Sequence, residues 1–293
     1  MRVFITGATG LIGSAVTAEL LSAGHTVTAL ARSDASAAKA EAAGAQVVRG
    51  GLTDLDVLRA ESERADGVIH LAFGNDFSSP EALAQNIADE TAALDAMGDA
   101  LIGSGKPLVT VSGTPVAAGR PSTEDDPLPT EGPVGGRSVT VERILRLADR
   151  GVRTSAVRLP RTVHNNGDGG FAGLLTRLAR QSGTAAYPAD GAQRWPAVHA
   201  LDAAALFRLA LEKAPAGTAW QAVADEGDAV KDIVAVIGRR LGLPVEERPA
   251  EAFGPLGPIF AVDQPASSAR TRAELGWEPT RPSLLADLEN IQP

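Results

Sequence analysis

The chain has 293 residues, a hydrophobic fraction of 44%, a formal net charge of −9 and no cysteine. This length suffices for one large α/β domain, or for a nucleotide-binding domain with a smaller lobe. The acidic balance argues against nucleic acids and anionic membranes as partners, and the lack of cysteine excludes disulfides, thiolate metal sites and a thiol nucleophile.

The first predicted element is a strand over the apolar residues 3–5, of the kind that is buried in a parallel sheet. Gly7, Gly10 and Gly13 follow it, and the apolar spacing after them predicts a helix that ends before Gly24. In a dinucleotide-binding turn the first glycine permits the tight turn, the second lets the pyrophosphate approach, and the third lets helix pack on strand. The free N–H groups at the start of the helix favour phosphate.

The second predicted strand, residues 25–31, ends at Arg32 and Ser33, where the adenosine ribose lies in such folds. A site selective for NAD places an acidic residue there, whereas an arginine suits the 2′-phosphate of NADP. We therefore predict NADP as the cofactor, bound in part by Arg32 and the Ser33 hydroxyl. The alternative is that Arg32 is a solvated surface arginine.

Strands and helices continue to alternate, which predicts an α/β fold with a doubly wound parallel (Rossmann) sheet. The expected helices cover residues 34–43, 80–101 and 138–150, and the expected strands cover residues 46–49, 67–72, 107–112 and 153–158. Between them, residues 114–137 are rich in proline, glycine and acid and predict a long surface loop with a function. No apolar run approaches membrane-spanning length and the first strand begins at residue 2, so we expect a cytoplasmic protein without a signal peptide.

The composition changes from Leu159 onward. We expect a loop at 160–168, helices at 171–181, 201–213, 230–241 and 267–275, and a strand near 219–223. Residues 1–160 are thus predicted to form an NADP-binding Rossmann domain. Residues 161–293 are predicted to form mostly a smaller lobe that caps the substrate at the carboxyl ends of the strands, with some segments returning to the sheet.

Three segments resemble the extended and atypical short-chain dehydrogenase/reductase family, in particular its NAD(P)-dependent epimerase/dehydratase-like members. These segments are residues 6–13 (Thr-Gly-Ala-Thr-Gly-Leu-Ile-Gly), residues 70–73 (His-Leu-Ala-Phe) and residues 275–279 (Leu-Gly-Trp-Glu-Pro). In this family the second segment passes the nicotinamide ribose, and an Asp-hydrophobe pair beside the adenine corresponds here to Gly51 and Leu52. The expected cofactor-binding residues are Gly7, Thr9, Gly10, Leu11, Ile12, Gly13, Arg32, Ser33, Leu52, Leu71, Ala72, Phe73 and Pro160.

The resemblance also places a catalytic tyrosine, and a lysine four residues later, in the helix after the fifth strand. Here these positions fall on Gly135 and Val139, so the usual acid–base pair is missing. Ser112 matches the serine that holds the substrate carbonyl in this family. Asp89 falls near the position of a family asparagine, and its alternative role is that of an exposed helical acid.

Other side chains are weighed as substitutes for the missing acid. His164, in the loop after the sixth strand, is a candidate proton donor because histidine titrates near neutral pH. Tyr187 is a further candidate, with packing as its alternative role. His70 and His199 are assigned mainly to structure. We therefore name Ser112, His164 and Asp89 as catalytic candidates and expect no metal.

We predict an NADP(H)-dependent oxidoreductase that acts by hydride transfer on a carbonyl or alcohol of a small organic molecule. The first alternative is a non-catalytic NADP-binding redox sensor or scaffold. The second is a sugar-nucleotide epimerase or dehydratase, whose chemistry depends most on the missing tyrosine. Arg161 and Arg194 are candidates for binding an anionic substrate, or are surface charges. A homodimer through the helices at 80–101 and 138–150 is weighed against a monomer.

Overall fold

The computed structural model describes residues 1–132 and 134–292. The chain forms two compact units, each built from several segments. Unit 1 consists of Met1–Ser112, Leu128–Arg158 and Ala204–Trp220, and unit 2 of Gly113–Pro127, Leu159–Ala203 and Gln221–Pro293. The chain leaves unit 1 after Ser112 and again after Arg158, and residues 204–220 return to it. The boundary at residue 160 stays a prediction.

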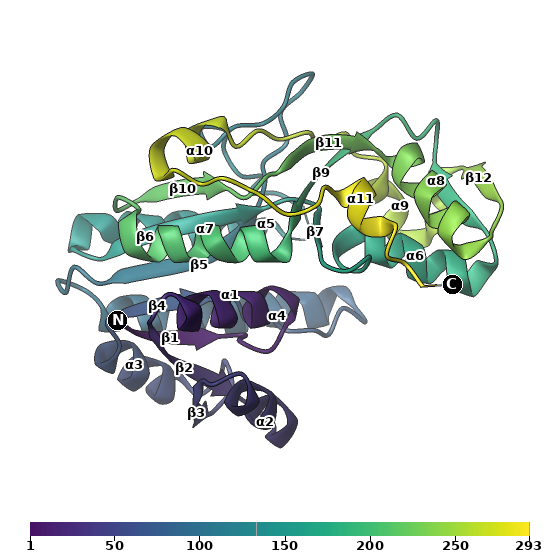
Figure 1. Cartoon of the computed structure of the whole chain (residues 1–293). Helices are drawn as coiled ribbons and strands as arrows, with labels where there is room; N and C mark the ends of the chain where they lie inside the picture. Colours follow the sequence, from purple (N-terminus) through teal and green to yellow (C-terminus); the bar gives the residue numbers. More distant parts are fainter. Residues whose placement is uncertain (133, 293) are drawn as a thin grey trace. The chain divides into compact units, whose positions relative to one another are not determined.

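Unit 1 contains a seven-stranded sheet in the order β10-β6-β5-β4-β1-β2-β3 (Figure 1). Its strands are β1 (Arg2–Thr6), β2 (Thr26–Ala31), β3 (Gln46–Arg49), β4 (Gly67–His70), β5 (Pro107–Gly113), β6 (Arg153–Leu159) and β10 (Thr218–Gln221). β1 lies between β2 and β4 and pairs in parallel with both, with Val3 opposite Val27 and Gly67. The predicted α/β fold with a parallel Rossmann sheet is confirmed.

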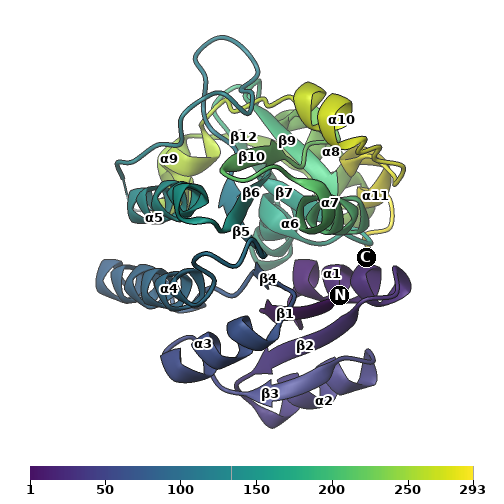
Figure 2. The ribbon, with the colours of Figure 1, turned by 90° about the vertical axis from the view of Figure 1, so that its left-hand side faces the viewer.

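Helices cover both faces of this sheet. Figure 2 shows α3, α4 and α5 on one face, and α1, α2 and α7 on the other. The helices are α1 (Leu11–Ser22), α2 (Asp34–Ala42), α3 (Leu55–Arg64), α4 (Pro80–Ala100), α5 (Gly135–Leu145), which continues into the 3-10 helix η1 (Arg146–Arg150), and α7 (Ala200–Lys213). Because helices cover both faces, the central strands are mostly apolar, and Phe4, Ile5, Val68 and Ile69 have no exposed surface.

α4 begins with a side-chain cap, whereas α5 begins without one. α4 begins with Ser79, whose hydroxyl accepts a hydrogen bond from the N–H of Ala82, and with Pro80 in the first turn. α5 begins at Gly135, earlier than the predicted residue 138, and its N-cap residue Val134 makes no side-chain capping bond.

Unit 2 has two small sheets and several short helices. The first sheet has the order β11-β9-β7 and the second pairs β12 with β8. The strands are β7 (Thr162–His164), β8 (Ala185–Pro188), β9 (Arg194–His199), β11 (Asp225–Ala229) and β12 (Val245–Arg248). The helical segments are α6 (Gly170–Ser182), α8 (Val230–Leu241), η2 (Ala250–Leu256), α9 (Gly257–Phe260), α10 (Ala269–Leu275) and α11 (Leu284–Leu288).

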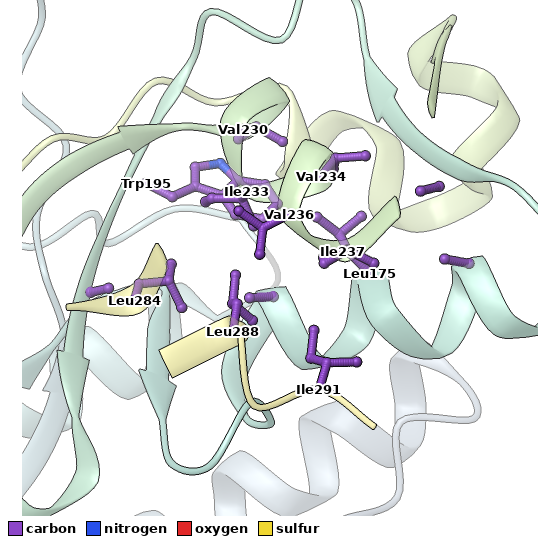
Figure 3. Close-up of a cluster of buried hydrophobic side chains, with 14 of the residues drawn as sticks. Leu175, Trp195, Val230, Ile233, Val234, Val236, Ile237, Leu284, Leu288 and Ile291 are labelled. Atoms are coloured by element: carbon purple, nitrogen blue, oxygen red, sulfur yellow. The ribbon is translucent and has the colours of Figure 1, made fainter. Parts of the chain in front are cut away.

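The core of unit 2 gathers apolar side chains from α6, α8, β9 and α11 (Figure 3). Trp195 lies at its centre with no exposed surface, and its ring is 5.6 Å from that of Phe171 and 5.5 Å from that of Phe260. The five short strands and α11 were not predicted from the sequence, whereas α6, α7, α8 and α10 lie within a few residues of their predicted ranges. Of the helices in the described ranges, none has the length and apolar character needed to cross a membrane.

Candidate functional site

The glycine loop after β1 is shaped by close backbone contacts. Gly7 has a φ of +76°, and a Cβ there would lie 2.7 Å from the nitrogen of Ala72. A Cβ on Gly13 would lie 1.9 Å from the Gly7 carbonyl oxygen, so both positions require glycine. A Cβ on Gly10 would make only an ordinary van der Waals contact, 3.7 Å from the Gly7 carbonyl oxygen, so the protein itself does not require glycine there.

The start of α1 is open to an anion. Gly10 is the N-cap of α1 and makes no side-chain capping bond, so no side chain competes for the first N–H groups of the helix. Thr9 and Ile12 are partly exposed and Leu11 is exposed. These features fit the pyrophosphate of a dinucleotide, as predicted from the spacing of the three glycines.

Basic side chains gather at the carboxyl end of β2. Arg32 is exposed, and its guanidinium forms no hydrogen bond or ion pair within residues 1–132 and 134–292. Arg49 donates to the Ser33 carbonyl at 2.7 Å, and Lys39 donates to the Thr9 carbonyl at 2.6 Å. The Ser33 hydroxyl caps α2 by accepting from the N–H of Ser36, at 3.2 Å. Sequence reasoning missed Arg49 and Lys39, because no spacing rule connects these residues to the turn after β2.

The segment after β4 approaches the glycine loop. Nδ1 of His70 lies 2.8 Å from Oγ1 of Thr6, and that oxygen also accepts from the N–H of Ala72 at 3.3 Å. Burial, and then the positive charge of Arg137, lowers the pKa of His70 to about 3, so the ring is neutral. His70 therefore has the structural role expected for it, since it ties β4 to β1. Leu71, Ala72 and Phe73 are partly exposed, and Leu52 is partly buried against the core.

Ser112 lies near the carboxyl end of β5. Its hydroxyl oxygen is buried and has no hydrogen-bond partner in the part of the chain that the structure describes. A buried hydroxyl without a partner costs free energy, and a ligand oxygen would satisfy it. Several other buried hydroxyls share this lack of a partner, and Ser112 differs from them in matching the family serine at the end of β5.

The two positions at which the tyrosine and lysine are expected differ in their surroundings. A Cβ on Gly135 would lie 2.3 Å from the Thr130 carbonyl oxygen, so any side chain there requires the backbone to move. Val139 is 50% exposed. Between these positions, Arg137 forms two hydrogen bonds to Glu90, from Nε to Oε2 at 2.7 Å and from Nη2 to Oε1 at 2.6 Å.

Arg137 was not predicted as a functional residue. Its guanidinium carbon lies 4.1 Å from the centre of the Phe73 ring. Glu90 has only 3% of its surface exposed, whereas the neighbouring Asp89 is partly exposed and accepts a hydrogen bond from Gln85 at 2.7 Å. Glu90 is thus the buried acid of α4. The sequence signal that could have identified Arg137 was an arginine in the first turn of α5, the helix that lacks the expected tyrosine and lysine.

In unit 2, His164 lies in β7 with 1% of its surface exposed. Its Nδ1 donates to Oδ2 of Asp287 at 2.9 Å, and its ring meets that of His199 edge-on at 5.3 Å. Asp287 also accepts from the N–H groups of Asn166 and Gly167, at 3.1 and 3.0 Å. Burial alone would raise the pKa of Asp287, but the Gly167 and His164 hydrogen bonds outweigh it and lower the pKa.

The remaining candidates also have protein partners. Arg161 donates to Gln264 at 2.6 Å, and burial lowers its pKa to about 10. Arg194 forms an ion pair with Asp263 at 2.8 Å. Tyr187 packs against the core of unit 2, and Pro160 is buried within the same unit. Among the described side chains, no group of three or more His, Asp or Glu residues is arranged to hold a metal ion.

Comparison with known proteins gives one family and several relatives. Residues 3–222 match the model of the NAD dependent epimerase/dehydratase family. An uncharacterized protein of Schizosaccharomyces pombe is 43% identical over 294 residues, with 98% of each chain covered. A 3-diazoavenalumate denitrifying reductase from a Streptomyces species is 30% identical over 302 residues, with 97% of each chain covered.

Among solved structures, one similar chain is a dTDP-glucose 4,6-dehydratase from Streptomyces venezuelae with NAD bound. The TM-score is 0.79 at 20% sequence identity, and the alignment covers 99% of this chain and 95% of that one. At this identity the likeness establishes the fold.

Proposed function

This chain belongs to the NAD dependent epimerase/dehydratase family, and on that premise we propose that it is an NADP(H)-dependent oxidoreductase. It transfers hydride between the nicotinamide and a carbonyl or alcohol of a small organic molecule. The coarser assignment, an oxidoreductase of this family that uses a nicotinamide cofactor, follows from the family itself. The preference for NADP and the class of substrate are proposed from the residues.

The observation that carries the proposal is the buried, unpartnered hydroxyl of Ser112 at the carboxyl end of β5. When bound, the nicotinamide supplies or accepts hydride. Ser112 then donates a hydrogen bond to the oxygen on which negative charge develops. Other hydroxyls of the described chain, such as that of Ser155, are also buried without a partner, so it is the place of Ser112 at the carboxyl end of β5 that favours an enzyme over a scaffold.

Preference for NADP is supported by the residues after β2. Arg32 is exposed and free to pair with a 2′-phosphate, and Arg49 holds the Ser33 carbonyl beside it. The N–H groups in the first turn of α1, which follows Gly10, would hold the pyrophosphate of either cofactor.

A reductive reaction is supported by the Streptomyces reductase that shares 30% of its residues with this chain over nearly the full length of both. The fold is shared with a sugar-nucleotide dehydratase, which keeps the sugar-nucleotide reaction as the second candidate. That reaction depends on the tyrosine whose expected position is Gly135, where a Cβ would meet the Thr130 carbonyl at 2.3 Å. Reduction of a small carbonyl compound is therefore the better supported function.

Two measurements test the proposal. The first is NADPH consumption with a panel of aldehydes, ketones and imines, where turnover of at least one class is expected. The second is titration of NADPH and NADH by fluorescence. We expect NADPH to bind at least about ten times more tightly, which requires only ~1.4 kcal/mol from the 2′-phosphate contact.

The variant Arg32→Ala should remove this preference. Arg59→Ala is the matched control, since Arg59 is an exposed arginine paired with Asp56 on α3. Equal affinity of the unaltered protein for both cofactors contradicts the NADP assignment, and no turnover across the panel contradicts the oxidoreductase.

A further inference from the structure

The ion pair between Arg137 and Glu90 differs from the other ion pairs that link α4 to α5 and to η1, which continues α5. Arg143 pairs with Asp95 and Arg150 with Asp99, and the side chains of these pairs are between 39% and 65% exposed. In the Arg137–Glu90 pair, by contrast, the Glu90 side chain is 3% exposed and accepts two hydrogen bonds from the guanidinium of Arg137. Exposed pairs are enough to link two helices, so the buried carboxylate needs another explanation.

The contacts of Arg137 fix its guanidinium but leave part of it free. Nε and Nη2 are bound to Glu90, and one face of the group lies on the Phe73 ring. The side chain keeps 28% of its surface exposed, and no acceptor in the described residues bonds to Nη1. Arg137 is therefore a rigid donor whose orientation is set in advance.

The position of Arg137 is that of a ligand-binding residue. Phe73 follows β4, and the positive charge of Arg137 acts on His70, the last residue of that strand. Ser112 lies at the same end of the neighbouring strand β5. Open parallel sheets bind their ligands at the carboxyl ends of the strands, and Arg137 lies at this end.

We propose that Arg137, held by Glu90 and Phe73, binds a carboxylate of the substrate through its free Nη1 edge. This inference rests on the proposed oxidoreductase function and narrows the substrate to a carbonyl or alcohol compound that carries a carboxylate. A net charge of −9 repels anions at long range, so a local cationic donor is required to select one. Arg161 and Arg194, the other candidates, already bind protein acceptors.

The test compares acids with their methyl esters, which remove the charge and add one methyl group. The pairs are pyruvate and methyl pyruvate, benzoylformate and methyl benzoylformate, and 4-carboxybenzaldehyde and methyl 4-formylbenzoate. Binding to the full-length protein saturated with NADP⁺ is measured by calorimetry, a readout that needs no turnover. At least one acid is expected to bind about tenfold more tightly than its ester, as a charge-assisted hydrogen bond would give.

Three variants locate the effect. Arg137→Gln should abolish the preference for the acid, whereas Arg143→Gln, on the same helix, should keep it. Glu90→Gln keeps Arg137 but weakens the hydrogen bonds that orient its guanidinium, so this variant should lose part of the preference for the acid. Thermal unfolding confirms that each variant is folded before it is compared.

The possible results separate this inference from the function on which it rests. A panel in which no acid binds better than its ester overturns the inference, as does a preference that survives in Arg137→Gln. If the acid preference depends on Arg137 but NADPH is never consumed, the anion site stands and the oxidoreductase fails. If NADPH is consumed with equal kcat/KM for acid and ester, the oxidoreductase stands and the anion site fails.

Discussion

Each unit contains a buried carboxylate that fixes a basic side chain, and the two arrangements differ in what they leave free. In unit 1, Glu90 holds Arg137, which stays 28% exposed with a free Nη1. In unit 2, Asp287 holds His164, which is 1% exposed. We call Phe73, Glu90 and Arg137 the edge cluster, and His164, His199 and Asp287 the tail cluster.

The difference teaches that residue type alone does not identify a functional group. Histidine is the usual proton carrier near neutral pH, yet the tail cluster encloses His164 and uses Asp287 to fasten α11 to β7. An arginine that was not predicted instead keeps exposed donors at the carboxyl edge of the sheet. Exposure separates the two roles, since Nε2 of His164 is buried without a partner in the described chain just as the Ser112 hydroxyl is. Each of the following predictions tests that separation.

The largest effect is expected when the tail cluster loses its carboxylate. Asp287→Ala leaves the Nδ1 of His164 and two N–H groups without their acceptor, which should lower the free energy of unfolding by about 3 kcal/mol. Urea denaturation measures this loss. In the control, Asp56→Ala, the exposed pair with Arg59 is broken, and the loss should stay within about 1 kcal/mol. Equal losses would show that the tail cluster is no more structural than a surface ion pair.

The second prediction concerns the unpartnered hydroxyl of unit 1. Ser112→Ala should lower kcat about a hundredfold, or ~2.7 kcal/mol, while leaving stability unchanged, because the hydroxyl has no partner to lose within the described chain. Steady-state kinetics and urea denaturation measure the two effects. Ser155→Ala in β6 is the matched control, since its hydroxyl is also buried and unpartnered. A normal kcat in Ser112→Ala would remove the serine from the reaction.

The third prediction decides between the two roles of His164. Because its ring is buried and bonded to Asp287, His164→Gln should cost about 2 kcal/mol of stability and leave kcat nearly unchanged. Denaturation and a pH profile of kcat check this. A large fall in kcat at unchanged cofactor affinity would make His164 the proton donor. So would a pH dependence of kcat that the variant lacks.

The smallest effect is expected at Asp228 in β11, whose Oδ2 is buried and without a partner among the described residues. Burial, and then the charges of Asp225 and Asp232, raise the pKa of Asp228 to about 6. The folded state therefore binds the proton more tightly than the unfolded chain does. The resulting stability is fully present below the unfolded pKa near ~3.9 and is lost as the pH rises through about 6.

Asp228→Asn should remove this dependence and raise stability at pH 7.5 by on the order of 1 kcal/mol, discounted for partial exposure. Urea denaturation at pH 5 and pH 7.5 gives the comparison, with the exposed Asp149→Asn as the control. A slope with pH that is the same in the variant and the parent would place the titration elsewhere.

The sequence by itself was enough to predict the Rossmann sheet and the glycine loop, because both depend on short-range patterns. Short apolar runs that alternate with segments of helical periodicity are typical of buried parallel strands connected by helices. Glycine is required at Gly7 by its contact with the segment after β4, and at Gly13 by its contact with Gly7 in the same turn. The strands of unit 2 escaped prediction because they are short and pair with distant segments. An example is β12, where Val245 lies opposite Ala185 of β8.

The tertiary structure decided which polar side chains are free to act. Glu90 and Arg137 are separated by 47 positions in the chain, and His164 and Asp287 by 123. No local pattern connects residues at such distances, because each pair forms only when helices and strands pack together. In the folded chain His164, which was predicted as a catalytic candidate, is buried, whereas Arg137, which was not predicted, stays partly exposed. The physical reason is that the chemistry of a polar group depends on whether its neighbours have already satisfied it.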